Sequence, residues 1–352
     1  MRTVALLLAV ALSIGPAEAA SRRRIVGRGG SDSPFGVVIN NSAVAASQSV
    51  RALDLAHNAG IQWAHIEFTW SRIQPSAGQA DYSAYTQIVA RAADSGIRLV
   101  GRLGYATPWN TTAPASVTNA TQREHYPPAD YDAWSRYIFT TVTLFKSSIH
   151  HWEIWNEPDL GPTTPDGPCS GFWCGTAAQY ARLLSVASDA VKRADPNAVV
   201  LFGGLALTSS ADPNFVFNVL TDPDNPGGDS FDVMAIHVTG SRTDAIRQMN
   251  FTKSQLAFGG AGLRPIWVTA VGYPSDPAAQ KIAPYFDGEA GQAAYAREIP
   301  TYLVSLGARK VFWLQLFDSG SDQFASYGLL TSLLATKKAY DAYSDTIRAY
   351  HP

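Results

Sequence analysis

Short apolar runs alternate with longer amphipathic stretches along most of the chain. The runs are rich in Val, Ile, Phe and Trp, and few of them alternate with polar residues. Parallel strands that are covered on both faces have this pattern. We therefore predict eight buried strands, at residues 35–39, 61–68, 97–104, 150–156, 198–205, 231–237, 265–272 and 310–317.

The stretches between the runs carry apolar residues at helical spacing. One such stripe consists of Tyr180, Leu183, Leu184, Ala187 and Val191, and another of Trp134, Tyr137, Ile138 and Phe145. Eight repeats of strand then helix predict a single-domain α/β fold, the (β/α)8 TIM barrel, over residues 34–352. An open doubly wound sheet is the alternative, but no glycine-rich dinucleotide fingerprint opens the first unit.

The N-terminal segment has the features of an export signal. Arg2 precedes an apolar run from Val4 to Ile14, and Ala17-Glu18-Ala19 supplies a small-residue cleavage site. A run this short does not reach the about 20 residues that span a bilayer. We therefore predict a signal peptide at residues 1–20 and a disordered lead-in at 21–33. The mature chain is then secreted or at the cell surface, with no membrane span.

The two cysteines lie close together in a Gly/Pro-rich stretch. Cys169 and Cys174 are five positions apart, and no histidine cluster lies near them to complete a metal site. In an oxidising compartment such a pair predicts a disulfide. A loop this short gains stiffness from the bond, while the whole fold gains little.

Composition narrows the classes of function. Lys+Arg is 27 and Asp+Glu is 29, so the net charge of −2 excludes a strongly basic nucleic-acid binder. Hydrophobic residues make up 46% of the chain, which excludes a disordered protein. Charged residues are only 16%, below the about 25% of an ordinary domain. We expect a monomer.

The fourth predicted strand ends in the most informative motif. Asn156 and Glu157 lie where a barrel collects its active site, and Pro158 stops the strand. A Glu here can protonate a leaving oxygen, while the amide binds a neighbouring hydroxyl. The sequence Trp155-Asn156-Glu157-Pro158 resembles the acid/base motif of glycoside hydrolase clan A, the retaining (β/α)8 glycosidases. The stretch from Phe68 to Pro75, Gly78 and Trp313 resemble family 39 and its relatives.

This resemblance covers residues 34–350 and implies an O-glycosyl hydrolase that acts on a polysaccharide or glycoside. It makes Glu157 the acid/base and Asn156 a sugar-binding residue, and it implies no metal or organic cofactor. The clan also requires a nucleophile Glu at the end of the seventh strand. The matching stretch reads Trp267-Val268-Thr269-Ala270-Val271-Gly272, so Ala270 occupies the nucleophile position. A methyl group cannot form the glycosyl-enzyme ester, and we expect a nearly inactive chain.

Two explanations of Ala270 compete: a deliberate replacement of Glu, and natural loss in a pseudoenzyme. His65 stands where the clan has an Arg on the second strand. The sixth strand reads Ile236-His237-Val238-Thr239 where relatives continue His-Pro-Tyr. Three departures around one site favour natural loss, whereas the otherwise intact seventh strand favours a single replacement.

Other carboxylates are candidates for the missing role. Asp318 follows the eighth strand and is the one we expect to serve as the base of an inverting enzyme, if any does. Glu67, Asp276 and Glu289 are expected to be structural or to bind sugar. For Glu153, four residues before Glu157, a structural ion pair is the stronger expectation.

Sugar sites place aromatic faces against the C–H faces of the rings. The resemblance makes Trp313 the floor beneath the cleaved sugar. The further expected binding residues are Trp70, Trp173, Tyr273, His237 and His65. Two hypotheses follow: a retaining hydrolase that lacks its nucleophile, and a carbohydrate-binding pseudoenzyme of an exopolysaccharide or cell-wall pathway.

Overall fold

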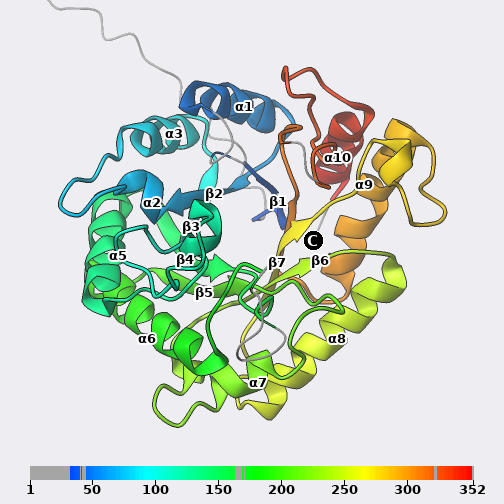
Figure 1. Ribbon diagram of the computed structural model, residues 1–352. Coiled ribbons are helices and arrows are strands. Elements are labelled where there is room, and N and C mark those ends of the chain that lie inside the picture. Colours follow the sequence, from blue (N-terminus) through cyan, green and yellow to red (C-terminus); the bar gives the residue numbers. More distant parts are fainter. Residues whose placement is uncertain are drawn as a thin grey trace, which may run out of the picture. The chain divides into compact units, whose positions relative to one another are not determined.

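The computed structural model describes residues 32–39, 41, 45–162, 169, 171–320 and 323–350. The predicted signal peptide lies outside the described residues, as does the predicted lead-in apart from Asp32 and Ser33. The part from Ser33 onward forms a ring of helices around a central sheet, as Figure 1 shows.

The sheet contains eight parallel strands, each close to its predicted place. They are β1 Phe35–Val38, β2 Trp63–Thr69, β3 Arg98–Gly104, β4 Ile149–Asn156, β5 Val199–Gly204, β6 Met234–Val238, β7 Ile266–Val271 and β8 Lys310–Trp313. Their order is β5-β4-β3-β2-β1-β8-β7-β6. Parallel bridges from Leu201 to Val233 and from Leu205 to Ile236 join β5 to β6, so the sheet closes into the predicted barrel.

One main helix follows each strand and packs on the outside of the barrel. These helices are α1 Ala46–Asn58, α3 Ser83–Asp94, α5 Tyr131–Phe145, α6 Ala177–Ala194, α7 Phe215–Leu220, α8 Arg242–Phe258, α9 Gly288–Ser305 and α10 Lys338–Ala349. Both predicted apolar stripes are buried, on α5 and on α6. Polar caps start several helices; Thr176 and Gln179, for example, form a capping box at α6.

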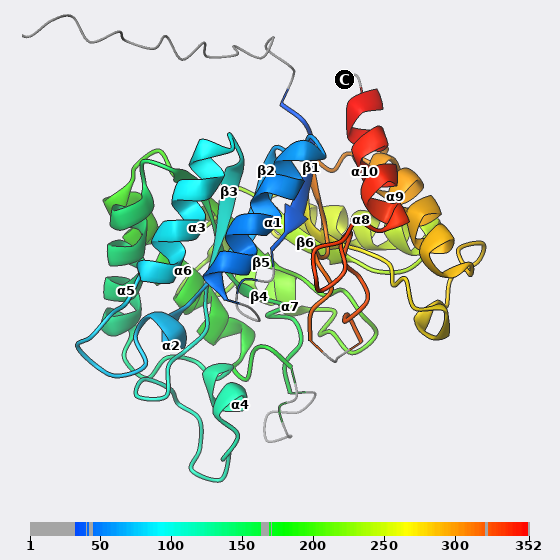
Figure 2. The same cartoon turned by 90° about the horizontal axis from the view of Figure 1, so that it is seen from above.

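Short elements occupy the loops at the C-terminal ends of the strands. Helix α2 Trp70–Ile73 follows β2 directly, and α4 Ala120–Glu124 lies in the long connection after β3. Figure 2 shows both on the lower side of the barrel. Two 3-10 turns complete the set, η1 Gly227–Asp229 and η2 Pro277–Ala279.

Inward-facing side chains follow the period of two that a strand imposes. On β2 these are Trp63, His65 and Glu67. Trp63 belongs to an aromatic floor inside the barrel. Its ring centroid is 5.5 Å from that of Trp267, and the ring centroid of Trp267 is 6.3 Å from that of Phe312. His65 and Glu67 come later on the same strand and lie above this floor, toward the C-terminal ends of the strands, where a barrel collects its active site.

Candidate active site

A cavity of about 540 Å³ opens above the aromatic floor. It is lined from β2 by His65 and Glu67, from β3 by Arg102, and from β4 by Asn156 and Glu157. On the other side it is lined by His237 of β6, Thr269 and Ala270 of β7, and Leu314 and Gln315 after β8. Five residues expected at the site therefore meet in one cavity: Glu157, Asn156, Ala270, His237 and His65.

Glu157 follows β4 through a sharp turn of the backbone. Trp155 and Glu157 have φ values of 75° and 43°, in the left-handed region that non-glycine residues rarely adopt. The Glu157 amide donates to the Gly204 carbonyl at 2.9 Å, which holds the turn against β5. The Glu157 Oε1 lies 2.7 Å from Nδ1 of His237. The carboxyl group is thereby fixed at the edge of the cavity.

The His237 imidazole reaches Glu157 because β5 ends in a glycine. A Cβ atom at Gly204 would lie 2.3 Å from His237 Nε2 and 2.9 Å from Thr269 Oγ1. No side chain fits at that distance unless the imidazole shifts. Gly204 therefore provides the space in which the His237–Glu157 contact forms.

A chain of polar contacts joins β2, β3 and β4. Arg102 Nη1 donates to Asn156 Oδ1 at 2.5 Å, and Nη2 of the same guanidinium binds the Glu67 carboxylate. Thr69 Oγ1 donates to the other Glu67 oxygen at 2.7 Å. Burial alone would raise the pKa of Glu67, but the Arg102 charge and these hydrogen bonds hold it below its ordinary value. Glu67 is therefore ionised, and Asn156 is oriented by Arg102.

Glu153 forms the structural ion pair that the sequence predicts. Its Oε1 lies 3.4 Å from His65 Nε2, and both side chains are almost completely buried. Burial opposes ionisation of Glu153, yet the charges of His65 and Arg102 lower the pKa of the carboxyl group below its ordinary value. His65 thus borders the cavity but is held by Glu153 beneath it.

The β7 side of the cavity carries few polar groups. The register between β6 and β7 shifts after Ile236, so that His237 pairs with Ala270 and both Thr269 and Ala270 reach the cavity. The Thr269 hydroxyl has no hydrogen-bond partner among the described residues. At residue 270 the structure therefore places only a methyl group at the cavity.

Four aromatic residues expected to bind sugar do not line the cavity. Trp313 is fully buried on the outside of the barrel, between Tyr295 of α9 and Tyr343 of α10. The cause is strand alternation: Phe312 and Leu314 face inward, so the residue between them faces the helices. Strand β8 also ends at Trp313, four residues before the predicted end.

The other three are also packed away from solvent. Trp70 is stacked on Tyr137, and its indole N–H donates to Gln74 Oε1 at 3.0 Å. Tyr273 is stacked on Tyr295 at 4.8 Å. Trp173 lies edge-on to Trp155 and donates to the Thr176 carbonyl. None of the three presents a free ring face to the cavity.

Sequence reasoning missed several residues that do line the cavity: Arg102, Tyr105, Glu124, His125, Phe172 and Phe324. A signal was available for Arg102, because a charged residue inside an apolar parallel strand points to a polar barrel interior. The others lie on loops, where no periodicity indicates the direction of a side chain.

The predicted disulfide is present. Cys169 and Cys174 are bonded with Cα atoms 5.5 Å apart. Asp318, the expected alternative base, is not among the cavity residues. Its two carboxylate oxygens lie 2.9 and 3.2 Å from Lys337 Nζ, and one of them accepts from the Gly328 amide. Asp318 therefore has a structural ion pair outside the cavity.

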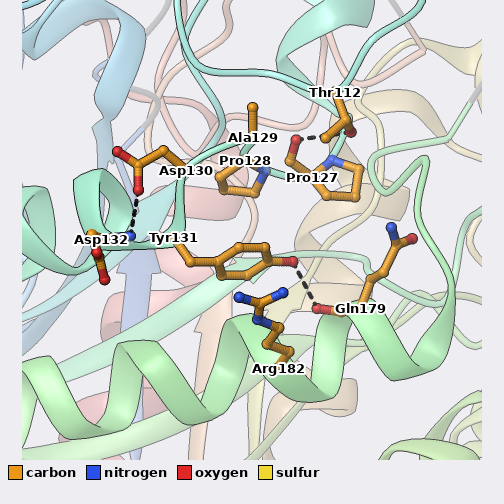
Figure 3. A pocket seen from close by; sticks show the side chains of 9 residues that line it. All are labelled: Thr112, Pro127, Pro128, Ala129, Asp130, Tyr131, Asp132, Gln179 and Arg182. Carbon is orange, nitrogen blue, oxygen red and sulfur yellow. Dashed lines mark hydrogen bonds between the residues drawn. The ribbon is translucent and has the colours of Figure 1, made fainter.

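A second hollow, of about 470 Å³, lies between the start of α5 and the start of α6. In Figure 3 the guanidinium group of Arg182 lies against the ring of Tyr131, 4.2 Å from its centroid. The Tyr131 hydroxyl donates to the Gln179 carbonyl. One face of this ring is thus already covered.

The described residues contain neither a metal site nor a membrane-spanning helix. No group of three or more His, Cys, Asp or Glu side chains among them is arranged to hold a metal ion. Within the same residues, no helix combines the length and the apolar character that crossing a membrane requires.

No protein-family model matches the sequence, and no curated protein is detectably similar to it. Solved structures are similar in fold. A family 39 glycoside hydrolase from the gut symbiont Bacteroides cellulosilyticus WH2 is 19% identical over 90% of this chain, with a TM-score of 0.64. This chain spans 63% of the length of that protein.

Two further structures are equally similar. A GH5_18 protein from Streptomyces cattleya, solved with GlcNAc, is 18% identical over 91% of this chain and 82% of its own, with a TM-score of 0.65. A monomeric beta-xylosidase from Caulobacter crescentus CB15 is 17% identical over 91% of this chain and 70% of its own, also with a TM-score of 0.65. At these identities the comparison shows the shared (β/α)8 barrel fold.

Proposed function

We propose that the protein is a secreted O-glycosyl hydrolase of clan A type, in which Glu157 is the acid/base and Ala270 replaces the nucleophile. The observation that carries the proposal is the meeting of Glu157, Asn156 and Ala270 in one cavity at the C-terminal ends of β4 and β7. The disulfide supports an oxidising compartment, and with it secretion.

The acid/base side of the site contains each part that the reaction needs. Glu157 delivers a proton to the glycosidic oxygen as the bond to the anomeric carbon breaks, and later removes a proton from the attacking water. Asn156, oriented by Arg102, hydrogen-bonds a sugar hydroxyl beside the cleaved bond. His237 holds the Glu157 carboxyl group in place.

The step between these two proton transfers has no residue to perform it. In retaining catalysis a second carboxylate attacks the anomeric carbon and forms a glycosyl-enzyme ester, which water then hydrolyses. The methyl group of Ala270 has no lone pair for this attack. We therefore expect binding of a polysaccharide or glycoside with almost no turnover in the chain as it stands.

Substitution at residue 270 tests the proposal. Ala270→Glu should raise kcat/KM on 4-nitrophenyl β-glycosides by about a thousandfold or more, with products of retained configuration by NMR. Ala270→Gln has the same size without the charge and should stay at background. Azide or formate added to the unaltered chain should restore part of the rate on activated glycosides, because a small anion takes the place of the missing carboxylate.

The outcome that contradicts the hydrolase is specific. It is the absence of turnover across a broad panel of glycosides, both in Ala270→Glu and in the unaltered chain with azide or formate. Inverted products from Ala270→Glu would also contradict the retaining mechanism.

A carbohydrate-binding pseudoenzyme is the second candidate, and two observations favour it. The first is Ala270, and the second is that Trp313 faces the helices, so that Leu314 and Gln315 line the cavity at the end of β8. This candidate predicts glycan binding on an array, unchanged by Ala270→Glu and without turnover in either protein.

A further inference from the structure

Three aromatic rings form one wall of the cavity and have no part in the proposed proton transfers. Tyr105 follows β3, His125 follows α4, and Phe172 lies in the segment closed by the disulfide. The centroids of Tyr105 and His125 are 5.0 Å apart, and those of His125 and Phe172 are 5.3 Å apart. We call these three residues the aromatic wall.

The aromatic wall lies on the Glu157 side of the cavity. The ring of Tyr105 packs edge-on against Trp155, at 5.1 Å and 86°, two residues before Glu157 in the chain. The indole N–H of Trp155 in turn donates to the Phe172 carbonyl at 2.7 Å. The turn that presents the acid/base and the wall beside it are therefore parts of one packed unit.

The disulfide segment is fixed to the rest of the wall by hydrogen bonds to its backbone and from its backbone. The Cys174 amide donates to the His125 carbonyl at 2.8 Å, and His125 Nδ1 lies 2.8 Å from the Gly171 carbonyl oxygen. Gln122 of α4 donates to the Cys169 carbonyl at 2.5 Å. Each of these contacts depends on the path of the chain between the two bonded cysteines, which the disulfide restricts.

The wall suits an uncharged ring. Burial lowers the pKa of His125 below its ordinary value, so the imidazole is neutral at pH 7. Neither Tyr105 nor Phe172 carries a charge there. The hollow in Figure 3 differs, because the Arg182 guanidinium already occupies the face of Tyr131. In the cavity the rings of Tyr105 and Phe172 are 20° from parallel, and aromatic rings of this kind pack against the C–H face of a sugar.

We infer that Tyr105, His125 and Phe172 form a stacking subsite for an uncharged pyranose ring on the Glu157 side of the cavity, and that the Cys169–Cys174 disulfide holds Phe172 in this subsite. The inference rests on the proposed function, because it requires a glycan in the cavity. It adds a chemical class for one part of that glycan and a redox dependence of its binding.

Binding of neutral tetrasaccharides tests the subsite. The probes are cellotetraose, xylotetraose and mannotetraose, titrated calorimetrically into the unaltered full chain. Phe172→Ala should raise the Kd of the best probe by about tenfold, which is the scale of one lost ring contact. Phe172→Tyr keeps the ring and should stay within about twofold. Trp109→Ala, which removes an exposed aromatic outside the cavity lining, serves as the matched control.

A further variant separates stacking from general packing. Phe172→Leu keeps apolar bulk and should preserve the fold while it loses the aromatic face, so we expect the same weakening as in Phe172→Ala. Near-UV circular dichroism checks that each variant is folded. Unchanged affinity in the folded Phe172→Leu protein overturns the stacking subsite.

The redox part has its own readout. Reduction of the disulfide, or the double change Cys169→Ser with Cys174→Ser, should weaken binding by about threefold or more. In the Phe172→Ala background the same reduction should have no further effect, because the ring that the disulfide positions is already gone. Equal weakening in both backgrounds would mean that the disulfide acts on the whole fold, which overturns this part.

The failure of the subsite and the failure of the proposed function give different results. If a tetrasaccharide binds and Phe172→Ala leaves its affinity unchanged, the subsite is wrong and the proposed function stands. If no tetrasaccharide binds and Ala270→Glu shows no turnover on the glycoside panel, the proposed function is wrong, and the subsite with it.

Discussion

The two halves of the cavity differ in how their residues are held. On the β2–β4 half, Glu67, Arg102 and Asn156 are joined by hydrogen bonds, and Glu157 is held by His237. On the β7–β8 half, Ala270 and Leu314 offer only apolar atoms, and the Thr269 hydroxyl has no partner among the described residues. We call these the acid/base half and the nucleophile half, after the roles proposed for Glu157 and for residue 270. The acid/base half is a network that joins three strands, whereas on the nucleophile half the Gln315 side chain is hydrogen-bonded to Phe324 and Ser319 in the loop after β8.

This difference predicts that the two halves respond unequally to substitution. In a connected network each side chain depends on its neighbours, so a single replacement leaves another buried group unpaired. A residue without such partners can change at little cost to the fold. The predictions below test whether the halves differ in this way, in order of decreasing size.

The largest effect is expected for Glu157 itself. In the Ala270→Glu background, Glu157→Gln should lower kcat/KM on alkyl glycosides by about 10²–10⁴, because proton transfer to the leaving oxygen is lost. Glycosides of 2,4-dinitrophenol, whose leaving group needs no proton, should lose far less. Glu124→Gln changes another carboxyl group of the same cavity and is the matched control. Similar losses for both substituted residues would contradict the role of Glu157.

The next effect concerns the ion pair beneath the cavity. Glu153→Leu leaves His65 buried without its partner, and we expect it to lower the free energy of unfolding by about 3–5 kcal/mol. Urea unfolding measures this loss. Replacing both residues by Leu should recover most of it, since no buried polar group then lacks a partner. If the double variant is as unstable as Glu153→Leu, the loss arises from packing and the pair is not its cause.

Gly204 tests the space beside His237. Gly204→Ala places a Cβ 2.3 Å from His237 Nε2, and we expect a loss of stability of about 1–3 kcal/mol from overpacking. In the Ala270→Glu background it should also lower kcat, because the imidazole moves away from Glu157. Gly228→Ala, where no atom lies within 4 Å of the added Cβ, should stay within about 0.5 kcal/mol. Equal stability of the two variants would show that the imidazole moves freely.

How far the sequence predicts this molecule depends on the kind of residue. The barrel and Glu157 are predictable because apolar runs mark strands, and because barrel sites collect where the strands end. The sequence pattern does not predict that Trp313 faces the helices. Both faces of a barrel strand are apolar, so the pattern cannot tell inward-facing from outward-facing residues. A shift of one residue along the strand decides whether a side chain faces the barrel interior or the helices.

The aromatic wall could not be predicted for a different reason. Tyr105, His125 and Phe172 come from three connections that are far apart in sequence. Contacts between these connections, such as the hydrogen bond from the Cys174 amide to the His125 carbonyl, bring them together. Sequence spacing carries no information about such contacts, although the disulfide itself was correctly predicted.

The Glu67–Arg102 contact makes stability depend on pH. The pKa of Glu67 is lower in the folded state than in the unfolded chain, whose value is about 4.3. Its stabilising contribution is therefore complete above that value and lost as pH falls through the folded value. We expect Glu67→Gln to be less stable at pH 7 by at least about 1 kcal/mol, because the buried Arg102 loses its partner charge, and the difference should shrink as pH falls through the folded pKa of Glu67. A difference that stays constant between pH 7 and 3 would contradict this linkage.

The smallest effect is expected on the β7–β8 half. Thr269→Val keeps the shape of the side chain and removes a buried hydroxyl that has no partner among the described residues, so the free energy of unfolding should change by less than about 0.5 kcal/mol or rise. Thr69→Val is the matched change on the other half. It removes the hydroxyl that donates to Glu67 and should cost about 1–2 kcal/mol. Equal losses in the two variants, measured by urea unfolding, would mean that the nucleophile half is as tightly connected as the acid/base half.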